Sequence, residues 1–304
     1  MDYDVISNFS LDYYQNASQA ITPEESMSMI LHEIVFSIIC LVGIVADGLI
    51  IYILNRLKNM KGATNVYIIN WLISDTFYLI LTPCFYRIFS ALEDLFIGEE
   101  IVCVSFEMAS MLQVTTIAFI GVICMNWYLD VFEVRVPSGR LYPYVILVVW
   151  LMAFSGIVTL SSLCIEFKYS LISHYLLFFG YAALMVLVLS MHWTRYVTKD
   201  RPHEMFNMNL NLVSVYVICW FPSWICLLVS VAENYSVLYY LSIVAACLGY
   251  LNPLFNLYIF ARCNRNFRMC LLQIFRCINR DYYSMEQEYL EPSEDLLNRV
   301  YSVA

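Results

Sequence analysis

The chain has 304 residues, of which 61% are hydrophobic and 13% are charged, and its formal net charge is −9. A soluble globular domain averages about 25% charged residues, so this chain has too few charges to coat a water-exposed surface. Its apolar residues fall in long runs, which indicates that lipid is the solvent for most of the surface. The composition therefore excludes an ordinary soluble domain and predicts an all-α membrane protein.

Seven apolar stretches are long enough to cross a hydrocarbon core of roughly 30 Å. Each is predicted to be a helix, because backbone polar groups in lipid must be hydrogen-bonded within their own segment. In chain order, the predicted helices cover residues 34–55, 65–90, 102–128, 142–163, 172–194, 206–231 and 237–260.

The seven stretches form one predicted bundle over residues 34–260, with a tail over 1–33 before it. After it we expect a short amphipathic eighth helix over 261–278 and a second tail over 279–304. Of the sixteen Lys and Arg residues, all but two fall on one side of the predicted membrane. Basic residues favour the cytoplasmic side. The pattern predicts a multi-pass plasma-membrane protein whose amino terminus is extracellular.

Two kinds of modification are expected on the outer side. The glycosylation sequons at Asn8, Asn16 and Asn234 all fall there. Cys103 opens the third predicted helix, and Cys164 lies in the outer loop that is expected after the fourth. Both cysteines face the oxidising compartment, so we expect a disulfide bond between them.

Several motifs occur in a fixed order along the bundle. They are the unbroken run from Cys40 to Tyr86 that contains MKGATNVYIINWLISD, the single Trp150, the sequence Cys219-Trp220-Phe221-Pro222 and the sequence Leu251-Asn252-Pro253. As a set, they resemble class A (rhodopsin-like) G-protein-coupled receptors over roughly residues 34 to 278. The run in the first two helices is most like the somatostatin, opioid and allatostatin-C receptors. The resemblance implies a receptor, not an enzyme, that senses an extracellular ligand of the peptide kind.

Four of these motif residues form a predicted activation switch. Pro222 removes one backbone hydrogen bond in the sixth helix and leaves a hinge there, and Pro253 does the same in the seventh. Trp220 precedes the first hinge and is expected where a ligand presses on its ring. Asn252 is positioned to satisfy backbone groups that Pro253 leaves free.

Two acids lie within predicted membrane spans, where a charge is costly enough to indicate a function. In the family, the position of Asp75 binds a sodium ion, and Thr116 falls where a partner of that ion is expected. Asp47 occupies the place of an asparagine in the first helix. Either the two acids share a proton or a cation, or a protonated Asp47 donates a hydrogen bond as the asparagine does.

The strongest departure from the family is at the inner end of the third helix. There Asn126-Trp127-Tyr128 aligns with the family triplet Asp-Arg-Tyr, whose arginine contacts the G protein. Trp127 carries no positive charge. Two readings follow: a receptor that reaches a G protein or arrestin through an unusual interface, or a receptor-like protein that no longer couples and serves as a decoy, a scavenger or a partner of another receptor.

The ligand cavity and the lipid anchors are predicted from position alone. The cavity candidates at the outer helix ends are Arg87, Glu107, Gln113 and Trp224. Glu107 either receives a cationic ligand or caps its helix near water. In the basic segment after the seventh helix, Cys270 and Cys277 are either palmitoylated or unmodified thiols.

Overall fold

The structure is a computed structural model. Its described residues are 23–57, 62–81, 99–134, 138–167, 172–198, 204–232 and 236–276, and the side chains near several ends of these ranges are not described.

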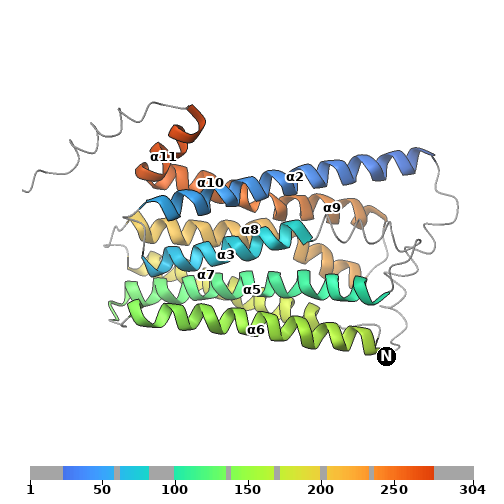
Figure 1. Ribbon diagram of the computed structural model, residues 1–304, viewed down its shortest axis with the longest axis horizontal. Helices are drawn as coiled ribbons and strands as arrows, with labels where there is room; N and C mark the ends of the chain where they lie inside the picture. The colour runs from blue at the N-terminus through green and yellow to red at the C-terminus, as the bar shows by residue number, and fades with distance from the viewer. Residues whose placement is uncertain are drawn as a thin grey trace, which may run out of the picture.

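The described elements are helices that lie side by side, with the last one crossing the end of the bundle (Figure 1). In chain order they are α2 (Pro23–Arg56), α3 (Ala63–Ile80), α5 (Glu99–Val131), α6 (Ser138–Phe167), α7 (Ile172–Val197), α8 (Glu204–Ala232), α9 (Ser236–Tyr250), α10 (Asn252–Cys263) and α11 (Arg265–Arg276).

Six spans among the described residues are long and apolar enough to cross a membrane. They are Ile34–Arg56, Val104–Val131, Leu141–Ile165, Ile172–Val197, Asn207–Cys226 and Leu241–Cys263. The last span joins α9 to α10, which meet at a turn beside Pro253. The helix α3 packs against α2, α5 and α6 and completes a bundle of seven. The predicted fold, seven membrane helices with a short amphipathic helix after them, is confirmed.

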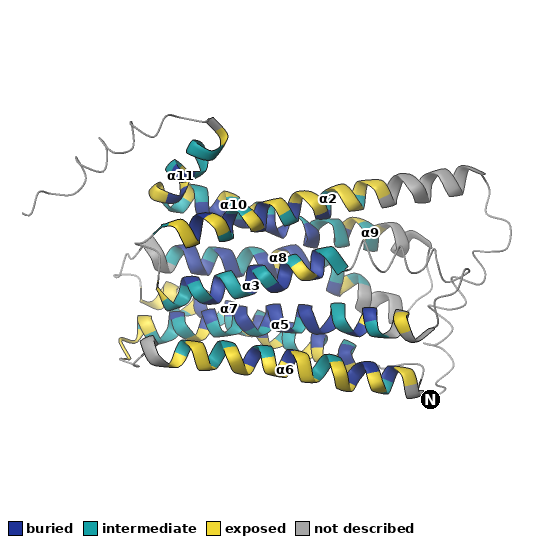
Figure 2. Cartoon of the chain, in the orientation of Figure 1, coloured by how far each residue is buried: buried dark blue, intermediate teal, exposed yellow. Residues whose placement is uncertain are grey.

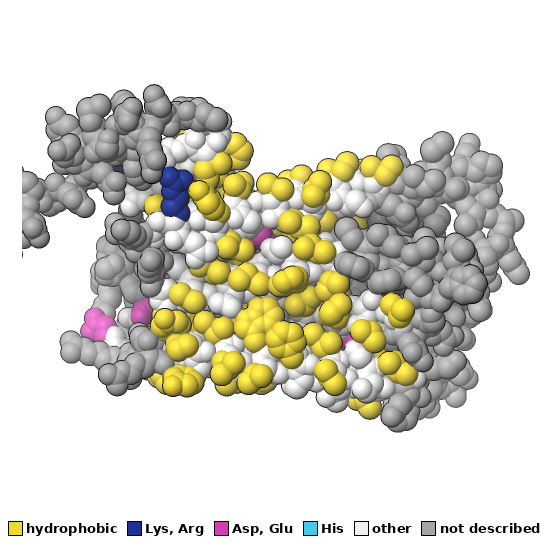
Figure 3. Space-filling view, in the orientation of Figure 1, with side chains coloured by type: hydrophobic (Ala, Val, Ile, Leu, Met, Phe, Trp, Pro, Cys, Tyr) yellow, Lys and Arg dark blue, Asp and Glu magenta, His cyan; other side chains and the backbone are white. Residues whose placement is uncertain are grey.

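The helix α5 is the centre of the bundle and packs against α3, α6, α7 and α8. In its most apolar 18-residue window 61% of the residues are buried, against 22% in α6. Figure 2 shows the difference as a mostly buried α5 beside an α6 with a long exposed edge. The exposed edge of α6 is apolar, with Tyr144, Phe154 and Val158 each at least 60% exposed. Apolar side chains cover much of the visible face (Figure 3), as expected for a surface solvated by lipid.

Polar bonds fix α3 against its neighbours inside the bundle. The indole Nε1 of Trp150 on α6 donates to Asn70 Oδ1 on α3 at 2.9 Å. The Ser74 hydroxyl donates to the Leu112 carbonyl of α5 at 2.8 Å. In a lipid solvent packing alone does not distinguish one apolar face from another, so such bonds help to set the rotation of each helix.

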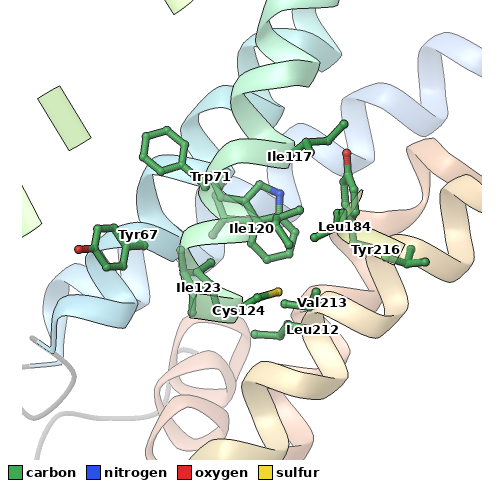
Figure 4. Packing of buried hydrophobic residues seen from close by; sticks show 14 of the residues in the cluster. Tyr67, Trp71, Ile117, Ile120, Ile123, Cys124, Leu184, Leu212, Val213 and Tyr216 are labelled. Atoms are coloured by element: carbon green, nitrogen blue, oxygen red, sulfur yellow. The ribbon is translucent and has the colours of Figure 1, made fainter. Parts of the chain in front are cut away.

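Large apolar side chains from α3, α5, α7 and α8 pack together in the core of the bundle (Figure 4). Trp71 on α3 and Tyr216 on α8 are both almost fully buried, and their rings meet edge to face at 5.9 Å between centroids. Ile117 and Ile120 of α5 belong to the same cluster. This packing joins the sixth membrane helix to the second and third.

Of the helix boundaries that differ from those expected from hydropathy, three bear on the predicted segments and sites. The helix α2 begins at Pro23, inside the segment predicted as tail, and proline is well tolerated at a first helical turn. The helix α6 continues to Phe167, so the prediction that Cys164 lies in a loop is wrong: it lies within α6 near its end. At the other end, α10 continues to Cys263 and α11 begins at Arg265.

Candidate functional site

Four aromatic rings from three helices meet around Trp220, and we call them the aromatic centre. They are Tyr78 of α3, Tyr216 and Trp220 of α8, and Tyr250 of α9. The Trp220 ring lies 5.5 Å from Tyr250, 6.0 Å from Tyr78 and 6.4 Å from Tyr216, measured between centroids. Tyr78 and Tyr250 stack on each other, and their hydroxyls are hydrogen-bonded at 3.0 Å.

The indole of Trp220 is seated directly on the backbone of α9. A Cβ added at Gly249 would lie 2.9 Å from Trp220 Cε3, which is closer than such atoms approach in proteins. Glycine is therefore the residue that lets the ring reach this seat. Trp220 is 7% exposed, and its Nε1 has no hydrogen-bond partner in the protein. The ring is held by aromatic packing and steric fit, without a hydrogen bond from its Nε1. Such a side chain is suited to a change of position.

A hinge lies next to this seat. Pro222 is inside α8, two residues after Trp220, and it deprives the helix of one backbone donor. Opposite it, α9 ends at a turn at Leu251 and α10 starts with Pro253 in its first turn. The structure thus places the predicted switch residues Trp220, Pro222 and Pro253 on α8 and on the α9–α10 junction, which pack against each other.

Buried polar side chains also lie on α2, α3, α5 and α10, and we call five of them the polar centre. Its members are Asp47 on α2, Asp75 on α3, Thr116 on α5, and Asn252 and Asn256 on α10, all at most 5% exposed. Asp75 is close enough to Asp47 for their charges to interact. Asn256 was not among the site residues predicted from the sequence, so its full burial is new information.

Many polar atoms of this centre have no hydrogen-bond partner in the protein. This holds for both carboxylate oxygens of Asp47, for the Thr116 hydroxyl, and for the amide atoms of Asn252 and Asn256. The hydroxyl of Thr76, which is near Asp47, donates to the Leu72 carbonyl instead, at 2.8 Å. A buried polar group without a partner is costly.

Unpaired carboxylate, hydroxyl and amide oxygens are suitable ligands for a hard monovalent cation, and they also suit ordered water. By its chemistry, this set of oxygen atoms suits the sodium ion that the family resemblance implies. Because the second carboxylate is present, the same atoms also fit a proton shared between two acids.

Near the C-terminal end of α5, which was predicted to be the inner end, Trp127 is a packing residue. It is 3% exposed and belongs to the apolar core, with its ring edge to face against Tyr128 at 5.2 Å. The Tyr128 hydroxyl is hydrogen-bonded to Ser190 Oγ of α7 at 2.5 Å. Asn126 Nδ2 donates to Thr64 Oγ1 of α3 at 2.7 Å. The triplet ties α5 to α3 and α7, and it presents no charge.

The residues predicted to line a ligand cavity near the outer helix ends lie in different environments. Glu107 is fully buried, and its carboxylate accepts a hydrogen bond from Ser173 of α7 at 3.3 Å. The reading of Glu107 as a cap near water is therefore wrong, because it lies between α5 and α7. Trp224 stacks on Tyr181 at 5.2 Å, between α8 and α7, and Gln113 is buried on α5.

The remaining predicted sites are only partly described. Cys164 is disulfide-bonded, and the side chain of its expected partner Cys103 lies outside the described ones, so the pairing stays a prediction. Cys270 lies on the buried face of α11 and is 3% exposed, and this burial raises the pKa of its thiol. Its side chain faces the bundle, not lipid. Also outside the described residues are Asn8, Asn16, Arg87, Asn234 and Cys277.

Sequence reasoning missed Tyr78, Tyr250 and Gly249, which build the seat of Trp220. The aromatic residues look like ordinary core residues in a chain so rich in tyrosine. The glycine did leave a trace: an isolated glycine within a helical stretch indicates a close backbone approach. Only the fold shows which side chain makes that approach.

No family model matches the chain. The chain is 24% identical to the somatostatin receptor type 1 of Mus musculus, over 95% of this chain and 83% of that relative. It is 21% identical to the galanin receptor 2b of Danio rerio, over 81% of this chain and 75% of that relative. A short part, 18% of the chain, is 33% identical to the somatostatin receptor type 4 of Rattus norvegicus. These relatives confirm the predicted resemblance to class A G-protein-coupled receptors, as a divergent relationship that extends over nearly the whole chain.

Proposed function

We propose that this protein is a plasma-membrane receptor that senses an extracellular peptide and transmits the signal across the bilayer. The observation that carries the proposal is the seat of Trp220 on Gly249, two residues before the hinge at Pro222. The relatives support the ligand class, because somatostatin and galanin receptors are named for peptides.

The proposed movement starts at the aromatic centre. A peptide that enters between the outer helix ends shifts the stacked pair Tyr78 and Tyr250, and these rings contact Trp220 directly. Since no hydrogen bond holds the indole, a small displacement moves it off Gly249. The inner half of α8 then swings about Pro222, where one backbone bond is absent.

The polar centre is proposed to set the balance between the two positions of α8. A cation or proton at Asp47 and Asp75 compensates buried carboxylates, so it stabilises whichever arrangement keeps α2, α3 and α10 closed around it. Thr116, Asn252 and Asn256 supply neutral oxygen ligands from the adjacent helices. Ligand removal from this centre is expected to favour the other arrangement.

The proposed orientation has the amino terminus outside. The described Lys and Arg side chains lie in the last turns of α2, α7 and α10 or on α11, and all of these are at one end of the bundle. They are Arg56, Arg195, Arg262, Arg265 and Arg268. Basic residues favour the cytoplasmic side, so this end is assigned to the cytoplasm.

Trp127 favours one second candidate, a receptor that binds its ligand without recruiting a G protein. The residue is buried and uncharged where the family pattern has an arginine. In this candidate, Asn126, Trp127 and Tyr128 lock α5 to α3 and α7, and the protein acts as a decoy, a scavenger or a partner of another receptor.

Ligand binding is tested without any transducer. The purified full-length protein in lipid nanodiscs is melted in the presence of a peptide panel that includes somatostatin and galanin. A ligand that binds only the folded state raises the melting temperature in a concentration-dependent way. A peptide that does so for the wild type, and less for Trp224→Ala or Gln113→Ala, supports the proposal. If no peptide shifts the melting temperature of well-folded protein, the peptide-receptor assignment fails.

A further inference from the structure

We propose that His192 on α7 and Ser214 on α8 form a hydrogen-bonded latch, which holds the two helices together and opposes the swing of α8 about Pro222. The imidazole Nε2 of His192 lies 2.8 Å from Ser214 Oγ. Both residues lie in the half of their helix that is nearer the end assigned to the cytoplasm. The inference rests on the proposed function, because it names what restrains the movement that this function requires.

The direction of this hydrogen bond follows from a second bond that Ser214 makes. Its hydroxyl donates its proton to the Leu210 carbonyl of α8 itself, at 2.6 Å. A hydroxyl has one proton and two lone pairs, so Ser214 Oγ accepts the bond that comes from α7. His192 is therefore the donor and carries a proton on Nε2.

A bond of the same construction joins α7 to α5. The Ser190 hydroxyl donates to the Leu187 carbonyl at 2.8 Å, so its oxygen accepts from the Tyr128 hydroxyl. Ser190 and His192 are two residues apart on α7, and such residues point to different sides of a helix. One side of α7 is thus bonded to α5 and another to α8. The latch therefore fixes α8 to a helix that is itself fixed to the centre of the bundle.

His192 lies on the surface of the bundle, where its partner on α8 matters most. The next aromatic residues on α7, Trp193 and Tyr196, are exposed, as is typical of the aromatic belt at a membrane–water boundary. A polar side chain at the lipid surface is costly unless it is paired. Leu212, two residues before Ser214, is almost fully buried in the core drawn in Figure 4. Its burial fixes the rotation of α8 that brings Ser214 to His192.

The latch is placed where the swing of α8 displaces it strongly. Ser214 lies eight residues before Pro222, which is about 12 Å along the helix axis. A rotation of roughly 10° about the hinge moves Ser214 by about 2 Å, which takes the 2.8 Å contact beyond hydrogen-bond range. The Tyr181 hydroxyl of α7 also donates to α8, at the Val217 carbonyl (2.6 Å), but this bond is closer to the hinge and is displaced less. His192 and Ser214 are therefore positioning residues whose contact opens when α8 swings.

The test measures the distance between α7 and α8 in the full-length protein in lipid nanodiscs, without ligand. Spin labels on unnatural amino acids at 198 and 207, near the ends of the two helices, report this distance by pulsed electron paramagnetic resonance. We expect a short distance to dominate in the wild type. Ser214→Ala removes the acceptor and His192→Phe removes the donor. Each should raise the ratio of the long to the short distance roughly threefold to tenfold.

Three further variants separate this hydrogen bond from general packing. The double variant His192→Phe with Ser214→Ala should be no more open than either single variant, because both changes break the same bond. His192→Gln keeps an N–H donor and should recover part of the closed population. Ser162→Ala is the matched control. The Ser162 hydroxyl donates to the Val158 carbonyl of its own helix, α6, at 2.9 Å, as Ser214 does to Leu210, and its loss should leave the distances unchanged.

Two results would overturn the latch. The first is that both distances occur in the same ratio in the wild type, Ser214→Ala and His192→Phe, so that α8 swings without restraint from this bond. The second is that the short distance alone is found in both variants, in which case the latch is wrong even where a peptide raises the melting temperature of the wild type. The expected opening in a protein that binds no peptide would instead retain the latch and remove the peptide-receptor assignment. Melting curves of each variant check that it is folded.

Discussion

The centre of the bundle and its inner end differ in how their side chains are packed and hydrogen-bonded. Around Trp220 and Asp75 there are close backbone approaches, unpaired polar atoms and two prolines, all of which favour rearrangement. At the inner end, Trp127 is buried in the apolar core, and its neighbours Asn126 and Tyr128 bond to α3 and α7. The centre is arranged to move, whereas the inner end of α5 is arranged to stay.

The difference separates two steps of transmembrane signalling. A movement that starts at the aromatic centre needs only α8 to swing about Pro222, and nothing at Trp127 prevents that. The triplet Asn126-Trp127-Tyr128 carries no charged group to meet a partner. Our proposal therefore assigns any contact with a transducer at this triplet to apolar side chains or to the arginines of α10 and α11.

Replacing two of the buried tryptophans, Trp220 and Trp127, one at a time should give the largest effect. Trp220→Ala and Trp127→Ala should each lower the free energy of unfolding by about 3–5 kcal/mol, because both rings are more than 90% buried. Their functional effects should differ. Trp220→Phe, which keeps most of the packing, should abolish the response to a peptide at matched surface expression, while Trp127→Phe should preserve it. Equal responses of the two phenylalanine variants would remove the distinction between the regions.

A methyl group at the seat of Trp220 should have the next largest effect. Gly249→Ala places a Cβ 2.9 Å from Trp220 Cε3, so the ring must shift, at a cost of about 1–3 kcal/mol. We expect a lower melting temperature together with changed basal signalling. Gly121→Ala is the control, since nothing lies within 4 Å of its added Cβ. If both variants have the same melting temperature and basal signalling, close contact with Gly249 does not hold the Trp220 ring in place.

Replacing one acid of the polar centre tests what the centre holds. Asp47→Asn keeps the shape and removes a buried carboxylate without a hydrogen-bond partner, so it should stabilise the protein by about 1 kcal/mol. It should also reduce the dependence of the melting temperature on sodium concentration and on pH. Melting curves across both variables check this. Identical curves for the variant and the wild type would leave Asp47 as a neutral hydrogen-bonding residue.

The smallest expected effect is local to α11. Asn264→Ala removes the side-chain acceptor for the Phe267 N–H, which costs about 1 kcal/mol for a helix cap. Hydrogen exchange should rise in α11 and stay constant in the aromatic centre. Faster exchange around Trp220 in this variant would show that the two ends of the bundle are coupled.

Much of the fold could be predicted from the sequence, because lipid requires long apolar helices and leaves few alternatives. The positions of Trp220 and Pro222 were also evident from their motif. The surroundings of these residues were not evident. Burial of Glu107 between α5 and α7 depends on helix rotation, and hydropathy reports length better than rotation.

The end of α6 at Phe167, past Cys164, was missed for a similar reason. A helix can continue beyond the lipid, and hydropathy does not then mark where it ends. Tyr78 and Tyr250 were hidden for another reason: their hydroxyls bond to each other across α3 and α9, 172 residues apart in sequence. Such a pair is created by the fold.

The most direct test of the central claim is transducer recruitment in cells, with G-protein and arrestin proximity sensors, for wild type and Trp127→Arg at matched surface expression. Our account predicts that a peptide which stabilises the purified protein also triggers recruitment by the wild type, with Trp127 as a tolerated residue of the inner end. A wild type that binds the peptide and stays silent, while Trp127→Arg gains a response, would contradict it and identify a receptor that binds without coupling.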